Sequence, residues 1–247
     1  MTTSHDHRRT GPVAIAYGMY AWIAFVACVL FAILVALLLP GLERRRRWVS
    51  AAARFSFTLS GIAATVEGLE TLPAGHCIVV ANHASYLDGV ILQAFLPPRF
   101  SYVIKGEMQN VPGVHFLLRR IGAKFVERFV TSGSARDARA LLKAASAGES
   151  LAFFPEGTFV REPGLGRFRP GAFAAAIKGE LPIVPLAILG SREVLPGGTM
   201  LPRRARLRVA ILPAIPPQHD AFGSSAMLAE AARQRILGIL DEPDLLA

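Results

Sequence analysis

The chain has 247 residues, of which 52% are hydrophobic and 18% are charged, and its mean hydropathy is +0.40. This composition excludes a disordered or acidic chain, and it is too apolar for an ordinary soluble domain. The formal charge of +9 suits nucleic acid, an anionic membrane surface or phosphorylated ligands as partners. The two cysteines, Cys28 and Cys77, are too few for a disulfide framework and favour a reduced, intracellular setting.

The first segment of the chain has the composition of a membrane anchor. The run between Arg9 and Glu43 has no charged residue and is longer than the ~20 residues that span a bilayer. It predicts a hydrophobic helix over about residues 12–40, stopped by Pro40-Gly41. Aromatic side chains that favour the membrane interface gather toward one end: Tyr17, Tyr20 and Trp22. A cleaved signal peptide is the alternative, but its apolar region is usually only ~7–15 residues long.

Basic residues flank this segment unequally. Arg44–Arg47 follow it directly, whereas Arg8 and Arg9 precede it together with Asp6. The positive-inside rule therefore predicts that the chain after the anchor lies on the cytoplasmic side of the cytoplasmic membrane. Arginines beside a membrane end also attract anionic lipid headgroups.

Residues 48–65 contain a single charged residue, Arg54. They are predicted to form a second helix, which either lies in the membrane interface or belongs to the core of the following domain. The chain is accordingly divided into an N-terminal anchor, residues 1–65, and a globular domain, residues 66–247.

The globular part alternates between strand and helix patterns. The predicted strands cover residues 76–81, 100–104, 123–127, 150–154, 183–189 and 206–212, and the predicted helices cover 86–95, 114–120, 132–147, 172–178 and 224–240. Repeated strand–helix–strand units predict an α/β fold with a mostly parallel central sheet flanked by helices. In such sheets ligands bind beyond the carboxyl ends of the strands, so the residues that follow each strand are candidates for function.

The loop after the first of these strands contains Asn82, His83 and, five residues after the histidine, Asp88. Across a strand-to-helix bend this spacing can place the carboxylate beside the imidazole. The aspartate would then fix the ring tautomer and leave the other nitrogen free to accept a proton. Because the chain contains no G-x-S-x-G motif, the activated hydroxyl would belong to the substrate. The alternative is a helix cap made by Asn82 or Ser85, with a surface histidine beside it.

The loop after the strand 150–154 carries Glu156, Gly157 and Thr158, which place a carboxylate, N–H groups and a hydroxyl at the same edge of the sheet. Arginines suited to phosphate binding follow: Arg161, Arg167 and Arg169. A solvated basic loop is the alternative interpretation.

Over residues 66–212 the two loops belong to an ordered set of four blocks that resembles the glycerolipid acyltransferase family, the glycerol-3-phosphate and lysophosphatidic acid acyltransferases. The blocks are Asn82-His83 with Asp88; Gly122, Phe125 and Arg128; 154–158 with 168–172; and 182–186. Lys105-Gly106-Glu107 and Val111-Pro112-Gly113 also match the family pattern. The chain departs from the family at Phe159, where an arginine or serine is usual, and this departure puts the identity of the acceptor in doubt.

The resemblance implies that His83 is a general base on an acceptor hydroxyl and that Asp88 orients it. The hydroxyl would attack the thioester of acyl-CoA or acyl-carrier protein, with N–H groups of residues 156–158 stabilising the oxyanion. Glu156 would hold a second acceptor hydroxyl or brace the loop. The implied substrate-binding residues are Asn82, Lys105, Arg128, Glu156, Gly157, Thr158, Arg161 and Arg169.

The predicted reaction is acylation of a lysophospholipid, foremost 1-acylglycerol-3-phosphate, to give phosphatidic acid. Other acceptors are alternatives (glycerol-3-phosphate or a lyso-ornithine lipid), as are a thioester hydrolase that uses the same residues on water and a lipid-binding protein without activity. No metal and no bound cofactor are expected, since the histidines and cysteines lack ligand spacing. Membrane lipids are the expected partners. Nucleic acid is not, because no recognisable binding motif is present.

Overall fold

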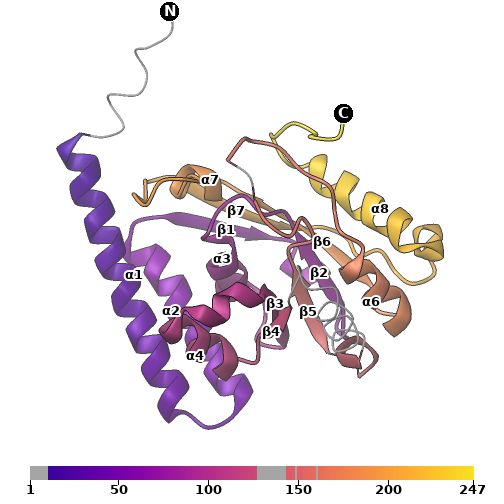
Figure 1. Ribbon diagram of the computed structural model, residues 1–247, viewed down its shortest axis with the longest axis horizontal. Helices are drawn as coiled ribbons and strands as arrows, with labels where there is room; N and C mark the ends of the chain where they lie inside the picture. Colours follow the sequence, from indigo (N-terminus) through magenta and orange to yellow (C-terminus); the bar gives the residue numbers. More distant parts are fainter. Residues whose placement is uncertain (1–10, 127–142, 148, 160) are drawn as a thin grey trace, which may run out of the picture.

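A seven-stranded β-sheet with helices on both faces forms the body of the molecule (Figure 1). The structure is a computed structural model that describes residues 11–126, 143–147, 149–159 and 161–247. The strands lie in the order β1-β7-β6-β2-β5-β3-β4. Their bounds are β1 Ala63–Glu67, β2 Ile78–Ala81, β3 Phe100–Lys105, β4 Lys124–Val126, β5 Ser150–Phe153, β6 Ile183–Leu189 and β7 Arg206–Ile211.

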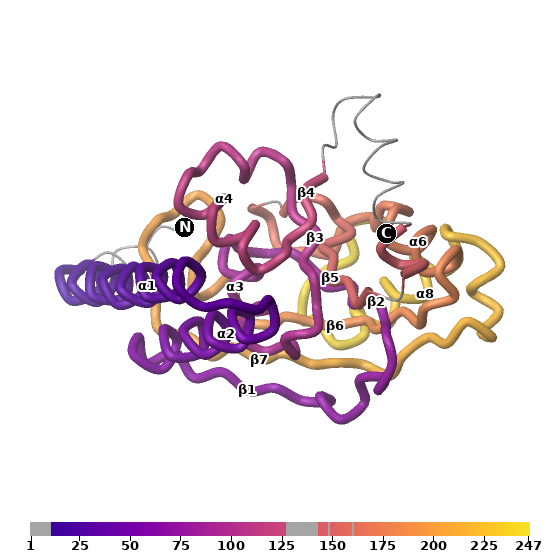
Figure 2. The backbone as a smooth tube through the Cα atoms, turned by 90° about the horizontal axis from the view of Figure 1, so that it is seen from below, coloured from indigo at the N-terminus to yellow at the C-terminus, as the bar shows by residue number. Residues whose placement is uncertain are grey.

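The helices divide between the two faces of the sheet (Figures 1 and 2). Ile78 and Val80 of β2 belong to the core beneath α6 (Gly171–Gly179) and α8 (Ser225–Leu237). Cys77, Val79 and Ala81 belong to the opposite core, which includes residues of α2 (Leu42–Leu59) and α3 (Asp88–Phe95). This alternation follows from the two-residue period of a strand whose two faces are both buried. The remaining helical elements are α1 Pro12–Leu38, α4 Pro112–Arg120, α7 Ser191–Val194 and the short 3₁₀ turns Leu69–Thr71, Gly106–Asn110 and Asp220–Gly223.

The predicted α/β class with a mostly parallel sheet is confirmed. The pairs β2–β5, β2–β6, β3–β4 and β3–β5 are all parallel. The exception is β7, which pairs with β6 antiparallel and carries β1 parallel to itself at the edge of the sheet. The strands and helices predicted between residues 76 and 240 agree with the structure within a few residues, apart from the helix 132–147, most of which lies outside the described residues.

The prediction of one helix over residues 48–65 is wrong at both ends. The helix α2 begins at Leu42 and ends at Leu59, and the edge strand β1 follows from Ala63 to Glu67. Gly61 separates the two, because its φ of +66° is a left-handed conformation that stops a helix. The inner face of α2 lies in the core, where Val49 and Phe57 are buried, while Trp48 and Phe55 remain exposed on its outer face.

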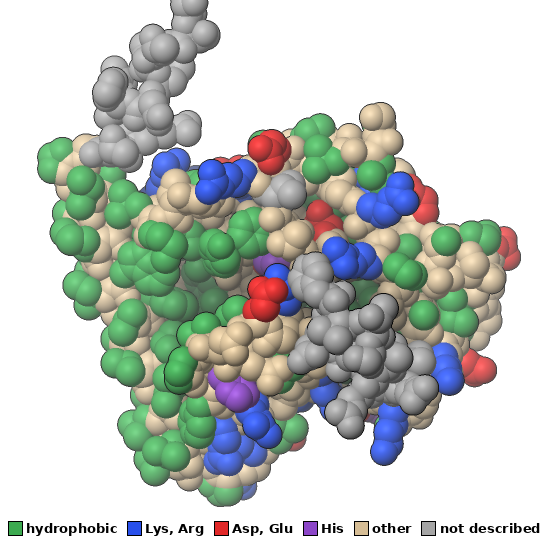
Figure 3. Space-filling model, in the orientation of Figure 1, with side chains coloured by type: hydrophobic (Ala, Val, Ile, Leu, Met, Phe, Trp, Pro, Cys, Tyr) green, Lys and Arg blue, Asp and Glu red, His purple; other side chains and the backbone are tan. Residues whose placement is uncertain are grey.

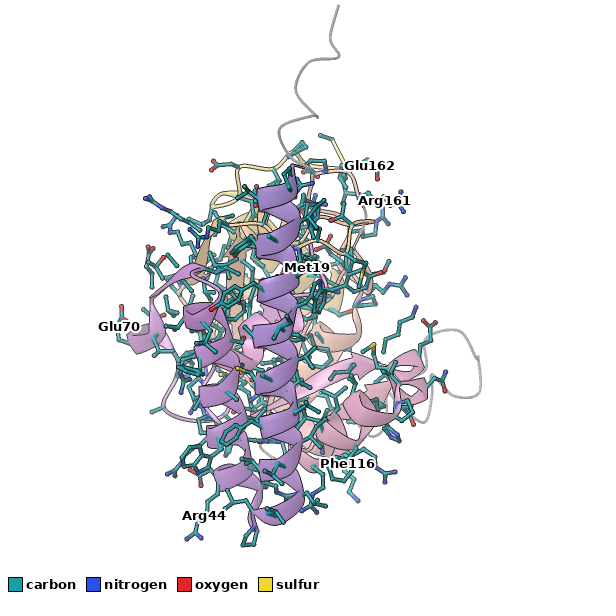
Figure 4. All side chains as sticks on the ribbon, turned by 90° about the vertical axis from the view of Figure 1, so that its left-hand side faces the viewer. Met19, Arg44, Glu70, Phe116, Arg161 and Glu162 are labelled. Atoms are coloured by element: carbon teal, nitrogen blue, oxygen red, sulfur yellow. The ribbon has the colours of Figure 1, made fainter. Side chains whose placement is uncertain are left out.

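The apolar helix α1 lies along the body of the protein (Figure 4). Near its N-terminal end Tyr17 Oη donates to Ser60 O at 2.9 Å, and Trp22 Nε1 donates to Met200 O at 2.5 Å. At its other end the guanidinium of Arg120 on α4 donates to Ala36 O at 2.7 Å. Small side chains at helical spacing form its buried stripe: Gly18, Ala21, Ala24, Cys28, Ala32 and Ala36. The helix is therefore attached to the domain along most of its length.

One arginine of the basic run 44–47 is structural. Arg46 is buried and donates to Ile121 O at 2.7 Å, Pro98 O at 3.0 Å and Ser101 Oγ at 2.7 Å. It thus joins α2 to β3, to the turn before β3 and to the residue that follows α4. Arg44 is exposed, and Arg47 forms an exposed ion pair with Glu43.

Replacing Arg46 with methionine is expected to lower the free energy of unfolding by about 2–4 kcal/mol. Each buried acceptor left without a donor costs ~1–3 kcal/mol, and removal of a buried charge offsets part of this loss. Thermal unfolding in detergent should show a Tm lower by about 5–10 °C. The matched variant Arg44→Met should unfold within about 2 °C of the wild type, because exposed substitutions usually change stability by less than ~0.5 kcal/mol. Equal Tm values for the two variants would contradict a structural role for Arg46.

Candidate active site

The two candidate loops leave neighbouring strands at the same edge of the sheet. β2 and β5 are adjacent and parallel, with Val80 opposite Phe153. Their carboxyl ends therefore point the same way, and Asn82-His83 meets the segment that begins at Phe154. The sequence alone placed these loops after strands; the pairing of β2 with β5 is what brings them together.

His83 and Asp88 form a hydrogen-bonded pair. His83 Nδ1 lies 2.8 Å from Asp88 Oδ2, and the same oxygen accepts the backbone N–H groups of Ala84 at 2.6 Å and Ser85 at 2.8 Å. The carboxylate is fully buried at the first turn of α3, whereas the imidazole is 19% exposed. With Nδ1–H donating to the carboxylate, Nε2 carries the free lone pair, which is the arrangement of a general base.

Aromatic rings surround the imidazole. Phe154 stacks on His83 with ring centroids 4.3 Å apart, and Phe159 meets the same ring edge-on at 4.9 Å. Phe159 also contacts Tyr86, with centroids 4.8 Å apart. These contacts fix the plane of the imidazole and reduce the access of water to it. The stacking of Phe154 on His83 was not predicted. Phe154 directly follows β5, and residues that follow neighbouring parallel strands meet at the same edge of the sheet, so its position gave a reason to expect it near His83.

Glu156 joins the two loops. Its Oε1 accepts the backbone N–H of His83 at 2.8 Å, and its Oε2 accepts the N–H of Gly166 at 3.0 Å. Burial raises the pKa of this carboxyl above its ordinary value, while the two N–H donors act in the opposite direction. Of the two roles expected for Glu156, these contacts favour the bracing of the loops over contact with the acceptor.

Replacing Glu156 with glutamine is expected to lower kcat ~10–100-fold and to leave the KM values for both substrates within about threefold. The amide of glutamine has one acceptor oxygen for the two N–H donors, so one donor faces an NH₂ group and the backbone at His83 shifts. Even a small misplacement of a catalytic group lowers the rate. Steady-state kinetics on the purified full chain would measure this. A rise in the acceptor KM with kcat preserved would instead assign Glu156 to the acceptor.

A cavity of about 770 Å³ opens beside His83 and extends between α1, α2, α3 and α4. Its lining is largely apolar, and each helix contributes one stripe of residues at a spacing of three and four. The helices leave room for the cavity because many of the residues that line it are small: Cys28, Ala32, Ala52, Ala53, Ser56 and Gly89. Figure 3 shows a hollow on this side of the molecule, beside the hydrophobic surface of α1.

The other predicted site residues fall into two groups. Lys105, Gly157, Thr158 and Arg161 line the cavity together with His83. Arg169 is exposed and is not part of the described lining, and Arg128 lies outside the described residues.

Asn82 is predicted to contact substrate, but both polar atoms of its buried side chain bond to the neighbouring strand. Its Nδ2 donates to Ile188 O at 2.9 Å, and its Oδ1 accepts the N–H of Ile188 at 2.7 Å. Asn82 therefore extends the β2–β6 pairing by one step and fixes the direction in which His83 leaves the sheet. Among the described residues, no three His, Cys, Asp or Glu side chains gather as metal ligands would.

Residues 63–189 match the family model described as Acyltransferase, which covers just over half of the chain. The chain therefore belongs to this acyltransferase family.

Curated relatives support the glycerolipid branch of this family. The chloroplastic 1-acyl-sn-glycerol-3-phosphate acyltransferase of Brassica napus is 29% identical over 69% of this chain and 49% of its own length. The corresponding enzyme of Saccharomyces cerevisiae is 25% identical over 91% of this chain and 73% of its own. That of Pseudomonas aeruginosa is 29% identical over 62% and 61%. The chain spans about half the length of the two chloroplastic relatives, the enzyme of Brassica napus and that of Arabidopsis thaliana.

A solved structure has the same fold. The crystal structure of a 1-acyl-sn-glycerophosphate acyltransferase from Thermotoga maritima matches with a TM-score of 0.75 at 22% identity, over 90% of this chain and 92% of that one.

Proposed function

We propose that the protein transfers a fatty acyl group from a thioester donor to the free hydroxyl of 1-acylglycerol-3-phosphate, giving phosphatidic acid. The observation that carries the proposal is the His83–Asp88 pair at the mouth of a long apolar cavity. The names of the relatives support the acceptor. The donor that we propose is acyl-CoA or acyl-carrier protein.

The reaction follows from the orientation of the imidazole. Nε2 of His83 takes the proton from the acceptor hydroxyl as its oxygen attacks the thioester carbonyl. The tetrahedral intermediate then collapses, the C–S bond breaks, and the imidazolium returns the proton to the leaving thiolate. Asp88 stabilises the imidazolium between the two steps, because its carboxylate is fixed 2.8 Å from Nδ1.

The developing oxyanion needs a preorganised donor. Gly157 N–H donates to Phe154 O at 3.1 Å within the turn, whereas the N–H of Thr158 has no acceptor among the described residues. Thr158 is exposed and lines the cavity beside His83. We therefore assign the oxyanion to the N–H of Thr158 rather than to the turn as a whole; losing such a donor typically costs ~10²–10³ in rate.

The outer face of α1 supports action at a membrane. The helix is long and apolar enough to cross a bilayer, and Ile23, Leu30 and Leu34 are among its exposed large side chains. Hydrophobic side chains cover this edge of the molecule in Figure 3. Because α1 also lines the cavity through Phe25, Cys28 and Val29, the lipid-facing helix lies next to the substrate site. A lysolipid would reach His83 from the bilayer, with the domain on the cytoplasmic side.

The test is an assay with labelled long-chain acyl-CoA, purified full chain, and a panel of acceptors in mixed micelles. With lysophosphatidic acid, we expect label to appear in phosphatidic acid and thiol to be released in equal amounts. Release of labelled free fatty acid without an acceptor would identify a hydrolase. Transfer to glycerol-3-phosphate or another lysolipid, but not to lysophosphatidic acid, would retain the reaction and refute the acceptor.

A further inference from the structure

The side chain of Phe159 places a phenyl ring beside the imidazole of His83. Phe159 contacts both His83 and Tyr86 through ring edges, so this wall of the cavity is apolar. An acceptor that carries a phosphate, as the proposed function requires, must therefore find its cation elsewhere in the cavity. Arg161, two residues further along the chain, is a lining residue.

Among the residues that the structure describes, two cationic side chains line the cavity, Lys105 and Arg161. The ammonium of Lys105 lies 2.7 Å from the carboxylate of Glu107, so its charge is already compensated. Arg161 is exposed and pairs with no carboxylate among the described residues. Its guanidinium is thus the less compensated of the two, and it can offer a planar pair of N–H groups to a phosphate.

Arg161 is positioned through both its backbone and its side chain. Arg192 Nη1 donates to Arg161 O at 2.9 Å, and Arg192 is itself held by Glu242, with Nε and Oε1 3.0 Å apart. The guanidinium lies against Gly198, where a β-carbon would be 2.7 Å from Cζ. Gly198 also has a φ of +82°, so glycine at this position provides both the turn and the space. In Figure 4 Arg161 lies at the level of the N-terminal end of α1, whereas Arg44 lies at the opposite end of the molecule.

The stem of Arg161 and the ring of Phe159 pack against the same glycine, Gly197. Phe159 touches the His83 ring, and the neighbouring Gly197 packs against both Phe159 and Arg161, at 3.5 and 3.4 Å from its β-carbon position. In 1-acylglycerol-3-phosphate the phosphate is on the carbon next to the one that bears the reacting hydroxyl. The phosphates of CoA are separated from the thioester by the whole pantetheine arm. Because Arg161 lines the same cavity as His83, and its stem packs beside the ring that contacts the base, it fits the acceptor better than the donor.

We propose that Arg161, seated on Gly197-Gly198, binds the phosphomonoester of the acceptor and so determines acceptor specificity. This inference rests on the proposed function, since it requires a phosphorylated acceptor. CoA also carries phosphates that an arginine can bind. The KM for the acceptor changes if Arg161 binds the acceptor phosphate, and the KM for acyl-CoA changes if it binds CoA.

The test compares Arg161→Ala with wild type, with each substrate varied in turn. We expect the KM for lysophosphatidic acid to rise ~10–100-fold, as for loss of a charged hydrogen bond, and the KM for acyl-CoA to stay within about twofold. Arg161→Lys should raise the acceptor KM ~3–10-fold, because it keeps the charge and loses the bidentate fork. Arg206→Ala, which removes an exposed arginine from β7, should behave as wild type.

The outcomes are distinct. A rise in the KM for acyl-CoA alone would assign Arg161 to the donor and overturn the proposal, as would unchanged KM values for both substrates. If the wild type transfers no acyl group to lysophosphatidic acid, the proposed function fails before any variant is compared. A thermal unfolding curve of Arg161→Ala that superimposes on the wild-type curve would show that the variant is folded.

Discussion

Replacement of His83 by alanine is expected to lower kcat ~10²–10⁴-fold, because this is the usual contribution of a general base. The imidazole is the only titratable side chain that is both hydrogen-bonded to a buried carboxylate and exposed to the cavity among the residues that the structure describes. The KM for either substrate should change little, since the base acts in the transition state more than in binding. Thiol release from acyl-CoA in the presence of lysophosphatidic acid measures the loss.

The control is a histidine that precedes β2, whereas His83 follows it. His76 is exposed, directly before the buried strand β2, and His76→Ala should keep full activity. The folded state of His83→Ala should be verified by thermal unfolding, because the variant also removes the ring on which Phe154 stacks. A folded His83→Ala that retains more than about a tenth of the wild-type kcat would refute the general-base mechanism.

The sequence predicted the elements that are strongly patterned. The buried runs of β2, β5 and β6 are short and mostly apolar, and the pattern alone placed their ends within two residues. The His83–Asp88 contact was predicted too, because five residues across a strand-to-helix bend can place the carboxylate beside the imidazole. The apolar helix α1 was evident from its composition.

Other features depend on neighbours that the sequence does not reveal. β1 is an edge strand that starts Ala63-Ala64 and alternates between exposed and half-buried residues, so little separates it from the preceding helix. Arg46 lies in a run of four arginines, and only packing against Ser101 and Ile121 shows that it is buried. The cavity takes one stripe from each of four helices that are separated in the chain, so no local pattern could describe it.

Asp88 has an environment that makes its asparagine variant informative. Three donors converge on Oδ2: His83 Nδ1 and the N–H groups of Ala84 and Ser85. The other oxygen, Oδ1, is buried and has no hydrogen-bond partner among the described residues. In Asp88→Asn the amide oxygen should take the Oδ2 position, because an NH₂ group there would face two backbone donors. The tautomer and orientation of His83 are then preserved, and only the negative charge is lost.

Asp88→Asn is therefore expected to lower kcat ~10²–10³-fold, less than the ~10⁴ seen where the same change imposes the wrong tautomer on a catalytic histidine. A unit charge about 4 Å from the imidazolium is worth ~4 kcal/mol at an effective dielectric constant of ~20, which corresponds to a loss of this size. Because the imidazolium that Asp88 stabilises forms in the transition state, the loss should fall on kcat, and the KM values for both substrates should stay within about threefold. Asp88→Ala, which also releases the two backbone N–H groups, should be as inactive as His83→Ala. An Asp88→Asn variant whose kcat stays within about threefold of the wild-type value would mean that Asp88 only holds the loop, and that the charge beside the imidazole has no part in catalysis.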